Sequence, residues 1–353
     1  MKLLSLLTLG LHFSAVMLLV GSLVLVLWLN ARGRGRKDVD MVHASYVLAK
    51  RLPVIMTYVI NLGVPPLLFL QVLYGQQIYS SSVLVGVPWI SVIPLVMAAY
   101  WLLYRSVHAI EKSKPVWPVA GLSLLIVMGI GQIYSMNMTL MLRPEVWNEM
   151  YQHSSIGMQG VKGDPTVTPR WLFVMAGGPL FGGLWAALLS NMVYLSEGVR
   201  NALKRAGSAS SVLGGTFMLF FGFRAVSLQP EHVLSGISNS PLHHLSLYAC
   251  AITIALATVV GVFHALGKKS SVGLSTAGIV LAFLSAATAG IVRDGVRDFT
   301  LLGKGFDVYK SSVYPNWSVL VVFLLLFVIM LAVIFWLLQV MRRATPPQEQ
   351  ITI

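Results

Sequence analysis

Residues 3–29 read LLSLLTLGLHFSAVMLLVGSLVLVLWL, an apolar run without a single Asp, Glu, Lys or Arg. A helix that crosses the hydrocarbon of a bilayer needs about 20 such residues. The run is too long for the core of a secretory signal peptide, only Lys2 precedes it, and four basic residues follow it between positions 32 and 37. We therefore expect a retained membrane-spanning helix at the start of the chain.

The composition extends this expectation to the whole chain. Of its 353 residues, 56% are hydrophobic and 10% are charged, a balance too apolar for the surface of a soluble domain. We expect an all-α, polytopic membrane bundle of about nine transmembrane helices that forms one transmembrane domain, residues 1–353. The expected spans are approximately 4–30, 53–75, 82–104, 118–142, 170–195, 211–228, 245–267, 271–292 and 316–341.

The distribution of charge predicts the orientation. The segments between these spans fall into two alternating sets, and Lys and Arg gather in cytoplasmic loops. The set that holds 31–52, 105–117, 196–210, 268–270 and the tail after 341 has sixteen Lys and Arg against five acids, and the other set has nine against seven. The first set is therefore expected in the cytoplasm, which puts the N-terminus outside and the C-terminus inside. Because topology explains nearly all of the net charge of +13, a nucleic-acid partner is not expected.

Several chemistries are excluded by what the sequence lacks. Cys250 is the one cysteine, so the chain has no disulfide, no CxxC metal pair and no CxxCH haem attachment motif. It has no Walker A motif, which argues against an ATP-driven pump. The longest segments between spans, 143–170, 229–244 and 293–315, fall on the outer side, and a partner is therefore expected to dock there.

His12 is the main candidate site residue, because a histidine inside the hydrocarbon region is costly without a partner. Imidazole is the usual protein ligand of b-type haem iron, and the alternative is a hydrogen bond between helices. At the outer end of the second span, Gln71 and the neighbouring Tyr74 fit a quinone or haem-propionate environment, or an aromatic belt. Arg293 and Arg297, near the outer end of the eighth span, could clamp carboxylates of a haem or an acidic partner, or be neutralised by Asp294 and Asp298.

Two further features concern helix packing. Pro65 and Pro66 remove backbone donors from the second span and are expected to kink or unwind it. The Gly177-Gly178-Pro179 stretch, followed by Gly182-Gly183, permits a close approach between helices.

The chain resembles subunit I of the cytochrome bd quinol oxidases. Leu7 to Phe13 is similar to the Leu-Thr-x-x-x-His-Phe pattern of that family's first helix, whose histidine binds a b-type haem. The Gly63-Val64-Pro65 stretch looks like its second helix, the Gly131 to Asn137 region like its fourth, and Thr288 to Arg297 like the end of its eighth. The resemblance implies nine helices, an outer N-terminus, and His12 as a ligand of haem iron.

The chain also departs from that family. It has no acid in the third span, where family members place glutamates, and Thr288 stands where they have a glutamate haem ligand. Their helix-5 histidine falls where this chain has Phe173, Val174 or Met175, so Met175 is the candidate cofactor contact there. Since proton delivery to oxygen and ligation of a haem pair need those groups, we expect no oxygen reduction.

Together these observations predict a membrane subunit of a respiratory electron-transfer complex in the inner (cytoplasmic) membrane. It would bind b-type haem through His12, with Arg293 and Arg297 as propionate or partner contacts. A membrane quinol would be the donor, and other membrane subunits or an outer-face c-type cytochrome would be the partners. A haem-free structural anchor is the first alternative, and a transporter, motivated by the double proline, is the second.

Overall fold

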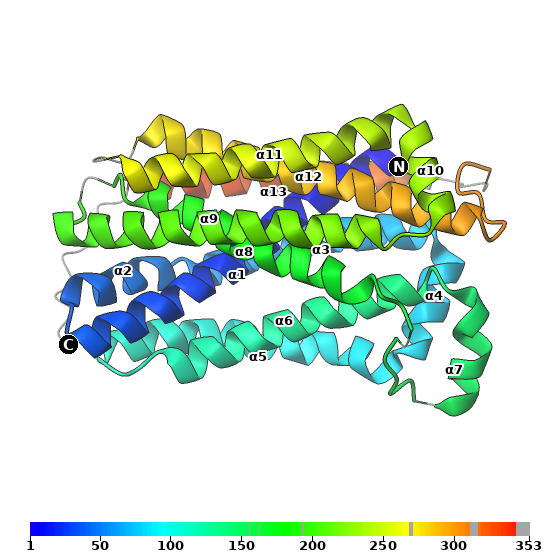
Figure 1. Ribbon diagram of the computed structural model, residues 1–353. Coiled ribbons are helices and arrows are strands. Elements are labelled where there is room, and N and C mark those ends of the chain that lie inside the picture. Colours follow the sequence, from blue (N-terminus) through cyan, green and yellow to red (C-terminus); the bar gives the residue numbers. More distant parts are fainter. Residues whose placement is uncertain (155, 162, 193, 268–270, 311–316, 344–353) are drawn as a thin grey trace. The chain divides into compact units, whose positions relative to one another are not determined.

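The computed structural model describes residues 1–154, 156–161, 163–192, 194–267, 271–310 and 317–343. Within these ranges the chain is almost entirely helical and has no strand (Figure 1). The long helices are α1 (Lys2–Arg36), α3 (Leu52–Leu73), α5 (Gly86–Glu111), α6 (Trp117–Leu140), α8 (Val167–Leu189), α9 (Glu197–Ser227), α11 (Pro241–Leu266), α12 (Val272–Leu302) and α13 (Trp317–Arg343). The short elements are α2 (Val39–Ala49), α4 (Gly75–Leu84), the 3-10 turn η1 (Pro144–Val146), α7 (Trp147–His153) and α10 (Glu231–Asn239).

Eight helical segments in the described ranges are long and apolar enough to cross a membrane, one of them formed by α2 and α3 together. This confirms the polytopic helical bundle that the sequence predicts. The ninth expected span, 316–341, coincides with α13, a helix of 27 residues, although residue 316 lies outside the described residues.

The helices extend well beyond the apolar runs. Residues 31–52, expected as a cytoplasmic segment between spans, contain the end of α1 and all of α2, whose first turn is capped by the Asp38 side chain accepting from the Met41 amide. Residues 196–210 form the first half of α9, with Ser196 as the capping residue. Apolarity marks the part of a helix that lies in lipid, whereas capping residues and turns mark where the helix ends.

The double proline does not unwind α3, which is helical through Pro65 and Pro66. Both prolines are buried. Neighbouring helices can satisfy the backbone groups that a proline frees in a membrane helix. Of the two expected outcomes, kinking or unwinding, the unwinding is therefore wrong.

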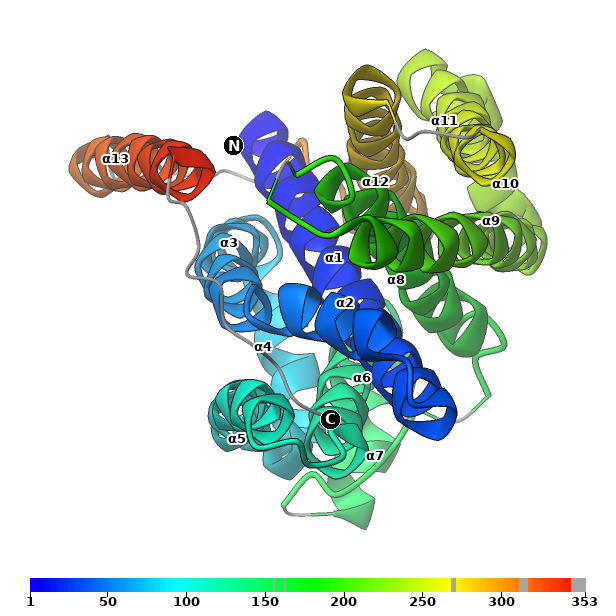
Figure 2. The same ribbon diagram turned by 90° about the vertical axis from the view of Figure 1, so that its left-hand side faces the viewer.

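Helix α1 lies in the middle of the bundle, with α3, α6, α8 and α12 packed around it (Figure 2). The backbones of α1 and α8 are in direct contact at Gly21. A Cβ placed on Gly21 would lie 1.8 Å from the Gly178 carbonyl oxygen, so no side chain fits between them. Helix α9 meets α8 in the same way, because a Cβ on Gly183 would lie 2.4 Å from the Gly207 carbonyl oxygen. The close approach expected from the glycines of α8 is confirmed.

The described residues up to Val308 form one compact unit, and residues 309–310 and 317–343 belong to a second. The second unit contains α13, in which the Phe323 and Phe327 rings stack with their centres 5.9 Å apart.

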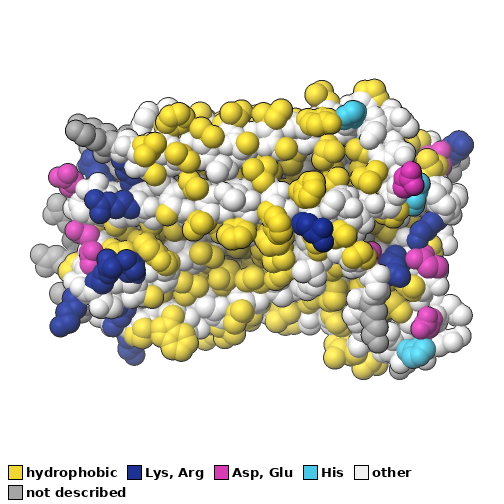
Figure 3. All heavy atoms as spheres, in the orientation of Figure 1, with side chains coloured by type: hydrophobic (Ala, Val, Ile, Leu, Met, Phe, Trp, Pro, Cys, Tyr) yellow, Lys and Arg dark blue, Asp and Glu magenta, His cyan; other side chains and the backbone are white. Residues whose placement is uncertain are grey.

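The two ends of the first unit differ in charge. At one end, on the left in Figure 1, lie the α1–α2 and α5–α6 connections, the C-terminal ends of α8 and α11 and the N-terminal ends of α9 and α12. Lys and Arg gather at this end in Figure 3, beside some acidic side chains, and the opposite end carries basic, acidic and histidine side chains. We call these the basic end and the mixed end. Of the expected cytoplasmic segments, 31–52, 105–117 and 196–210 thus lie at the basic end.

Candidate functional site

The His12 imidazole is held between α1 and α3. Its Nδ1 lies 3.1 Å from the Val59 carbonyl oxygen. Since a carbonyl oxygen only accepts, Nδ1 carries the proton, and the lone pair of a neutral ring is on Nε2. No hydrogen-bond partner of Nε2 is present among the described residues, and the side chain is only partly buried. The ring is therefore oriented by one nitrogen while the other remains available as a ligand.

A glycine makes room for this ring. A Cβ on Gly63 would lie 2.8 Å from Cε1 of His12 and 3.0 Å from Nδ1. Gly63 is one helical turn after Val59 on α3, so the same face of α3 supplies the hydrogen bond and the space. Any side chain at Gly63 would push the imidazole away from its carbonyl partner.

Arg293 brings positive charge to this region. Its guanidinium lies 5.8 Å from the centre of the ring of Phe13, the residue that follows His12. The Arg293 charge also acts on the His12 imidazole. Arg170 on α8 interacts electrostatically with Arg293, and it hydrogen-bonds the Thr166 carbonyl and the Thr139 hydroxyl. Neither arginine forms an ion pair with a described residue. The nearest compensating charges are Asp294 for Arg293 and Asp164 for Arg170. Because cations within a membrane span are costly, both arginines are candidate contacts of an anionic ligand.

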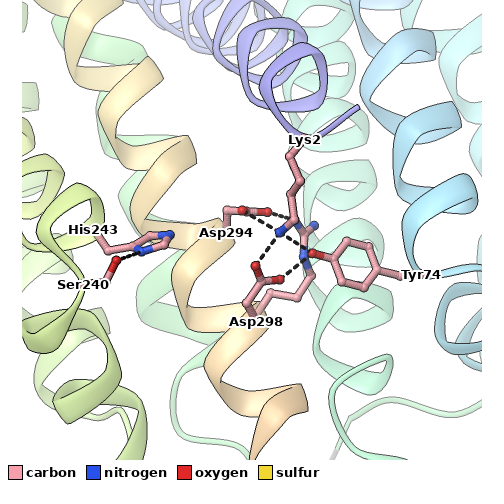
Figure 4. A network of polar contacts seen from close by, with 7 residues as sticks. Lys2, Tyr74, Ser240, His243, Asp294 and Asp298 are labelled. Carbon is pink, nitrogen blue, oxygen red and sulfur yellow. Dashed lines mark hydrogen bonds and ion pairs between the residues drawn. The ribbon is translucent and has the colours of Figure 1, made fainter. Parts of the chain in front are cut away.

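Arg297 has a different environment, which we call the outer network: Lys2, Tyr74, Asp294, Arg297 and Asp298. Figure 4 shows the Lys2 ammonium between both aspartates and the Tyr74 hydroxyl. Lys2 Nζ lies 2.8 Å from Asp294 Oδ2 and 2.6 Å from the Tyr74 oxygen, and it also pairs with Asp298. Arg297 pairs with Asp294, and its guanidinium lies 4.1 Å from the centre of the Tyr74 ring. Two cations and two anions make the outer network neutral.

The phenol of Tyr74, which lies just beyond the last residue of α3, completes this network by donating to Asp298. Burial raises the pKa of Tyr74 above its ordinary value of 10.0; the nearby Arg297 charge opposes the shift, and the two aspartates add to it. The phenol therefore stays protonated and keeps its role as donor.

The other two candidates lie on different helices. Met175 is buried on α8, where its methyl group would lie 3.4 Å from a Cβ on Gly131 of α6. Gln71 is partly buried on α3 and forms no side-chain hydrogen bond with a described residue. Among the described residues, neither side chain forms a hydrogen bond with His12.

Two further histidines of the mixed end have hydrogen-bond partners of their own. His243 Nδ1 lies 2.7 Å from the Ser240 hydroxyl, and His244 Nδ1 lies 3.0 Å from the Ser238 carbonyl oxygen. Among the described residues, no group of three or more His, Cys, Asp or Glu side chains is arranged to hold a metal ion.

Sequence reasoning missed the partners that come from other helices. The sequence pattern indicates Lys2 only as a charge on the outer side, and it does not indicate Arg170 as a site residue. Both are basic residues at the mixed end, against the usual preference of Lys and Arg for the cytoplasmic side. Their position could have indicated a functional or structural role from the sequence. A Lys or Arg on the outer side is expected to pair with a buried acid or an anionic ligand.

Comparison with solved structures gives a strong match in fold. The bd oxidase from Geobacillus thermodenitrificans matches with a TM-score of 0.68 and 13% sequence identity, over 98% of this chain and 98% of that chain. No family model and no curated protein sequence matches. At this identity the likeness establishes the architecture: the chain has the helical fold of a bd oxidase chain.

Proposed function

We propose that this chain is a haem-binding membrane subunit of a respiratory electron-transfer complex in the cytoplasmic membrane. The observation that carries the proposal is the His12 imidazole, fixed through Nδ1 by the Val59 carbonyl with Nε2 left free. Histidines that ligate metals commonly donate their other ring N–H to a carbonyl or carboxylate, which fixes the ring and its tautomer. The bd oxidase fold supports the same assignment.

The residues around His12 fit one b-type haem. His12 Nε2 would ligate the iron, and Arg293, which has no ion-pair partner in the described residues, would face the propionates. Arg297 is excluded from that role in the proposal, because the outer network already neutralises it. Bound haem would supply one-electron transfer. The chain would hold the haem at His12 and compensate its anionic edge at Arg293.

The donor in this proposal is a membrane quinol, with Gln71 as a candidate contact near the outer end of α3. Electrons would leave at the mixed end, towards a sister subunit or an outer-face c-type cytochrome. Oxygen reduction is not part of the proposal. Thr288, which stands in place of the family's glutamate ligand, uses its hydroxyl to donate to the Leu284 carbonyl of its own helix at 2.7 Å.

The test is a pyridine haemochrome assay and a reduced-minus-oxidised spectrum of the purified protein, with three variants. His12→Ala is expected to lose the b-haem band, and Arg293→Gln to lower haem retention. His244→Ala, which changes a partly buried histidine of the mixed end, should leave the band unchanged. A wild-type protein without a b-haem band, or an unchanged band in His12→Ala, would overturn the proposal.

A haem-free structural anchor is the second candidate, and the absence of a glutamate at Thr288 favours it. Under this alternative His12 serves only to join α1 to α3. His12→Ala would then impair assembly with partner subunits without any spectral change. Because α3 stays helical through both prolines, the transporter hypothesis loses the broken helix that motivated it.

A further inference from the structure

An apolar cavity of about 610 Å³ lies between α1, α8 and α9. Met175 lines it, whereas His12 and Arg293 do not. The volume of the cavity falls within the range of about 300–1,000 Å³ that is usual for small-molecule sites. Small residues line part of it, namely Ala176, Ala206, Ala209 and Gly214. Larger apolar side chains line most of the rest, among them the aliphatic Leu172 and Leu213 and the rings of Trp28 on α1 and Phe217 on α9. We call this apolar cavity the groove.

The groove runs along α9 from Ala206 to Phe221. At 1.5 Å per residue this is roughly 22 Å, longer than the roughly 15 Å that one leaflet contributes to the hydrocarbon core. A whole acyl chain can therefore lie in it.

The lining selects hydrocarbon over a polar ring. Ser210 supplies a hydroxyl, but this hydroxyl already donates to the Pro179 carbonyl at 2.9 Å. A quinone ring needs donors for its carbonyl oxygens, and burying them without partners is unfavourable. An acyl chain has no such requirement.

Two arginines mark one end of the groove. At the basic end, Arg32 lies over the ring of Trp28, with its guanidinium carbon 5.6 Å from the ring centre. Arg205 directly precedes Ala206 on α9, and both arginines are exposed. Neither forms an ion pair or a hydrogen bond with a described residue. A phosphate held here would sit at the membrane surface while its acyl chain enters the groove.

From this arrangement we infer that the groove between α1, α8 and α9 binds an anionic phospholipid, with the phosphate at Arg32 and Arg205. The lipid comes from the leaflet at the basic end. Basic residues near a membrane surface attract anionic lipid by about 1 kcal/mol each, so two of them predict a preference of about tenfold or more over a zwitterionic lipid.

The experiment is native mass spectrometry of the full chain after detergent washing and incubation with equal amounts of phosphatidylglycerol and phosphatidylcholine carrying the same chains. The wild-type protein is expected to retain one phosphatidylglycerol with about tenfold preference. Arg32→Gln combined with Arg205→Gln should abolish the preference, and Ala209→Phe, which fills the groove, should reduce retention of both lipids.

Arg105→Gln is the matched control. Arg105 lies 5.6 Å from the centre of the Trp101 ring near the same end of the bundle, but Trp101 does not line the cavity. The inference is overturned if wild type retains both lipids equally, if Arg105→Gln lowers the preference as much as the double variant, or if the retained molecule is a quinone. The double variant alters only exposed side chains, so it remains informative if Ala209→Phe fails to fold.

Discussion

Replacing Lys2 with Met tests whether the outer network stabilises the bundle. The change removes one of two cations and leaves Asp294, Asp298 and Arg297 with a net charge of −1. The side chains of Asp294 and Asp298 are 4% and 10% exposed, so water compensates little. At an effective dielectric constant of 20, the attraction between Lys2 Nζ and Asp294 Oδ2 at 2.8 Å is about 6 kcal/mol before desolvation is counted.

The net effect is smaller, because the ions lose hydration when they are buried. Removing one partner of a buried ion pair costs roughly 3–5 kcal/mol, and Lys2, whose side chain is 19% exposed, belongs at the lower end of this range. A loss of about 3 kcal/mol corresponds to a drop of about 4 °C in apparent Tm for a chain of this size. The assay is thermal unfolding in detergent, followed by intrinsic fluorescence.

Two further variants make this test specific. Lys304→Met removes an ion pair to Glu145 of 2.6 Å, but Glu145 is 52% exposed, so the expected cost is below about 1 kcal/mol. Adding Asp298→Asn to Lys2→Met restores a neutral network and should recover part of the lost Tm. If Lys2→Met lowers Tm no more than Lys304→Met, or if Asp298→Asn adds a further loss, the reasoning about the outer network is wrong.

Three other predictions concern packing, the haem site and pH. Gly21→Leu should remove the folded monomer from size-exclusion profiles, because even its Cβ would lie 1.8 Å from a carbonyl oxygen of α8, whereas Gly129→Leu, with open space around it, should be tolerated. Gly63→Ala, whose Cβ would lie 2.8 Å from the histidine ring, should lower haem content if the proposed function holds, and a normal content would contradict the geometry. Partial burial opposes ionisation of Glu145, but the hydrogen bond and charge of Lys304 outweigh it and lower the pKa of this carboxyl below 4.5. Its stabilisation is therefore present above pH 4.5 and lost as the pH falls through the lowered pKa, so the Tm difference between wild type and Lys304→Met should shrink at acidic pH; a constant difference would refute this.

The fold could be predicted from sequence because lipid imposes a simple rule on composition. Each span appears as an apolar run, and the sorting of Lys and Arg separates the two ends. Helix ends were predicted less well: residues 39–49 and 197–210 are helical but belong to segments that were assigned to loops because charged residues cluster in them. The hydropathy of a segment reflects its depth in the membrane. It gives little information on the residue at which a helix ends outside the membrane.

The candidate site was only partly predictable. His12 stood out because a polar ring in an apolar run needs a partner, yet that partner is the Val59 carbonyl, which no side-chain pattern reveals. The spacing of Asp294 and Arg297 allowed an i,i+3 pair within one helix to be foreseen. The third member, Lys2, comes from the other end of the sequence, and only the tertiary structure brings it into place.

The pairing of Lys2 with Asp294 also constrains how the protein is made. The two residues are 292 positions apart, and at about 5–20 residues per second the ribosome needs roughly 15–60 seconds to pass from one to the other. During that interval the first helix is already inserted, while the acids that hold its ammonium group do not yet exist. For most of its synthesis the nascent chain therefore lacks the ion pairs of Lys2. Asp294 and Asp298, which complete these pairs, are among the last residues of the first unit to be synthesised.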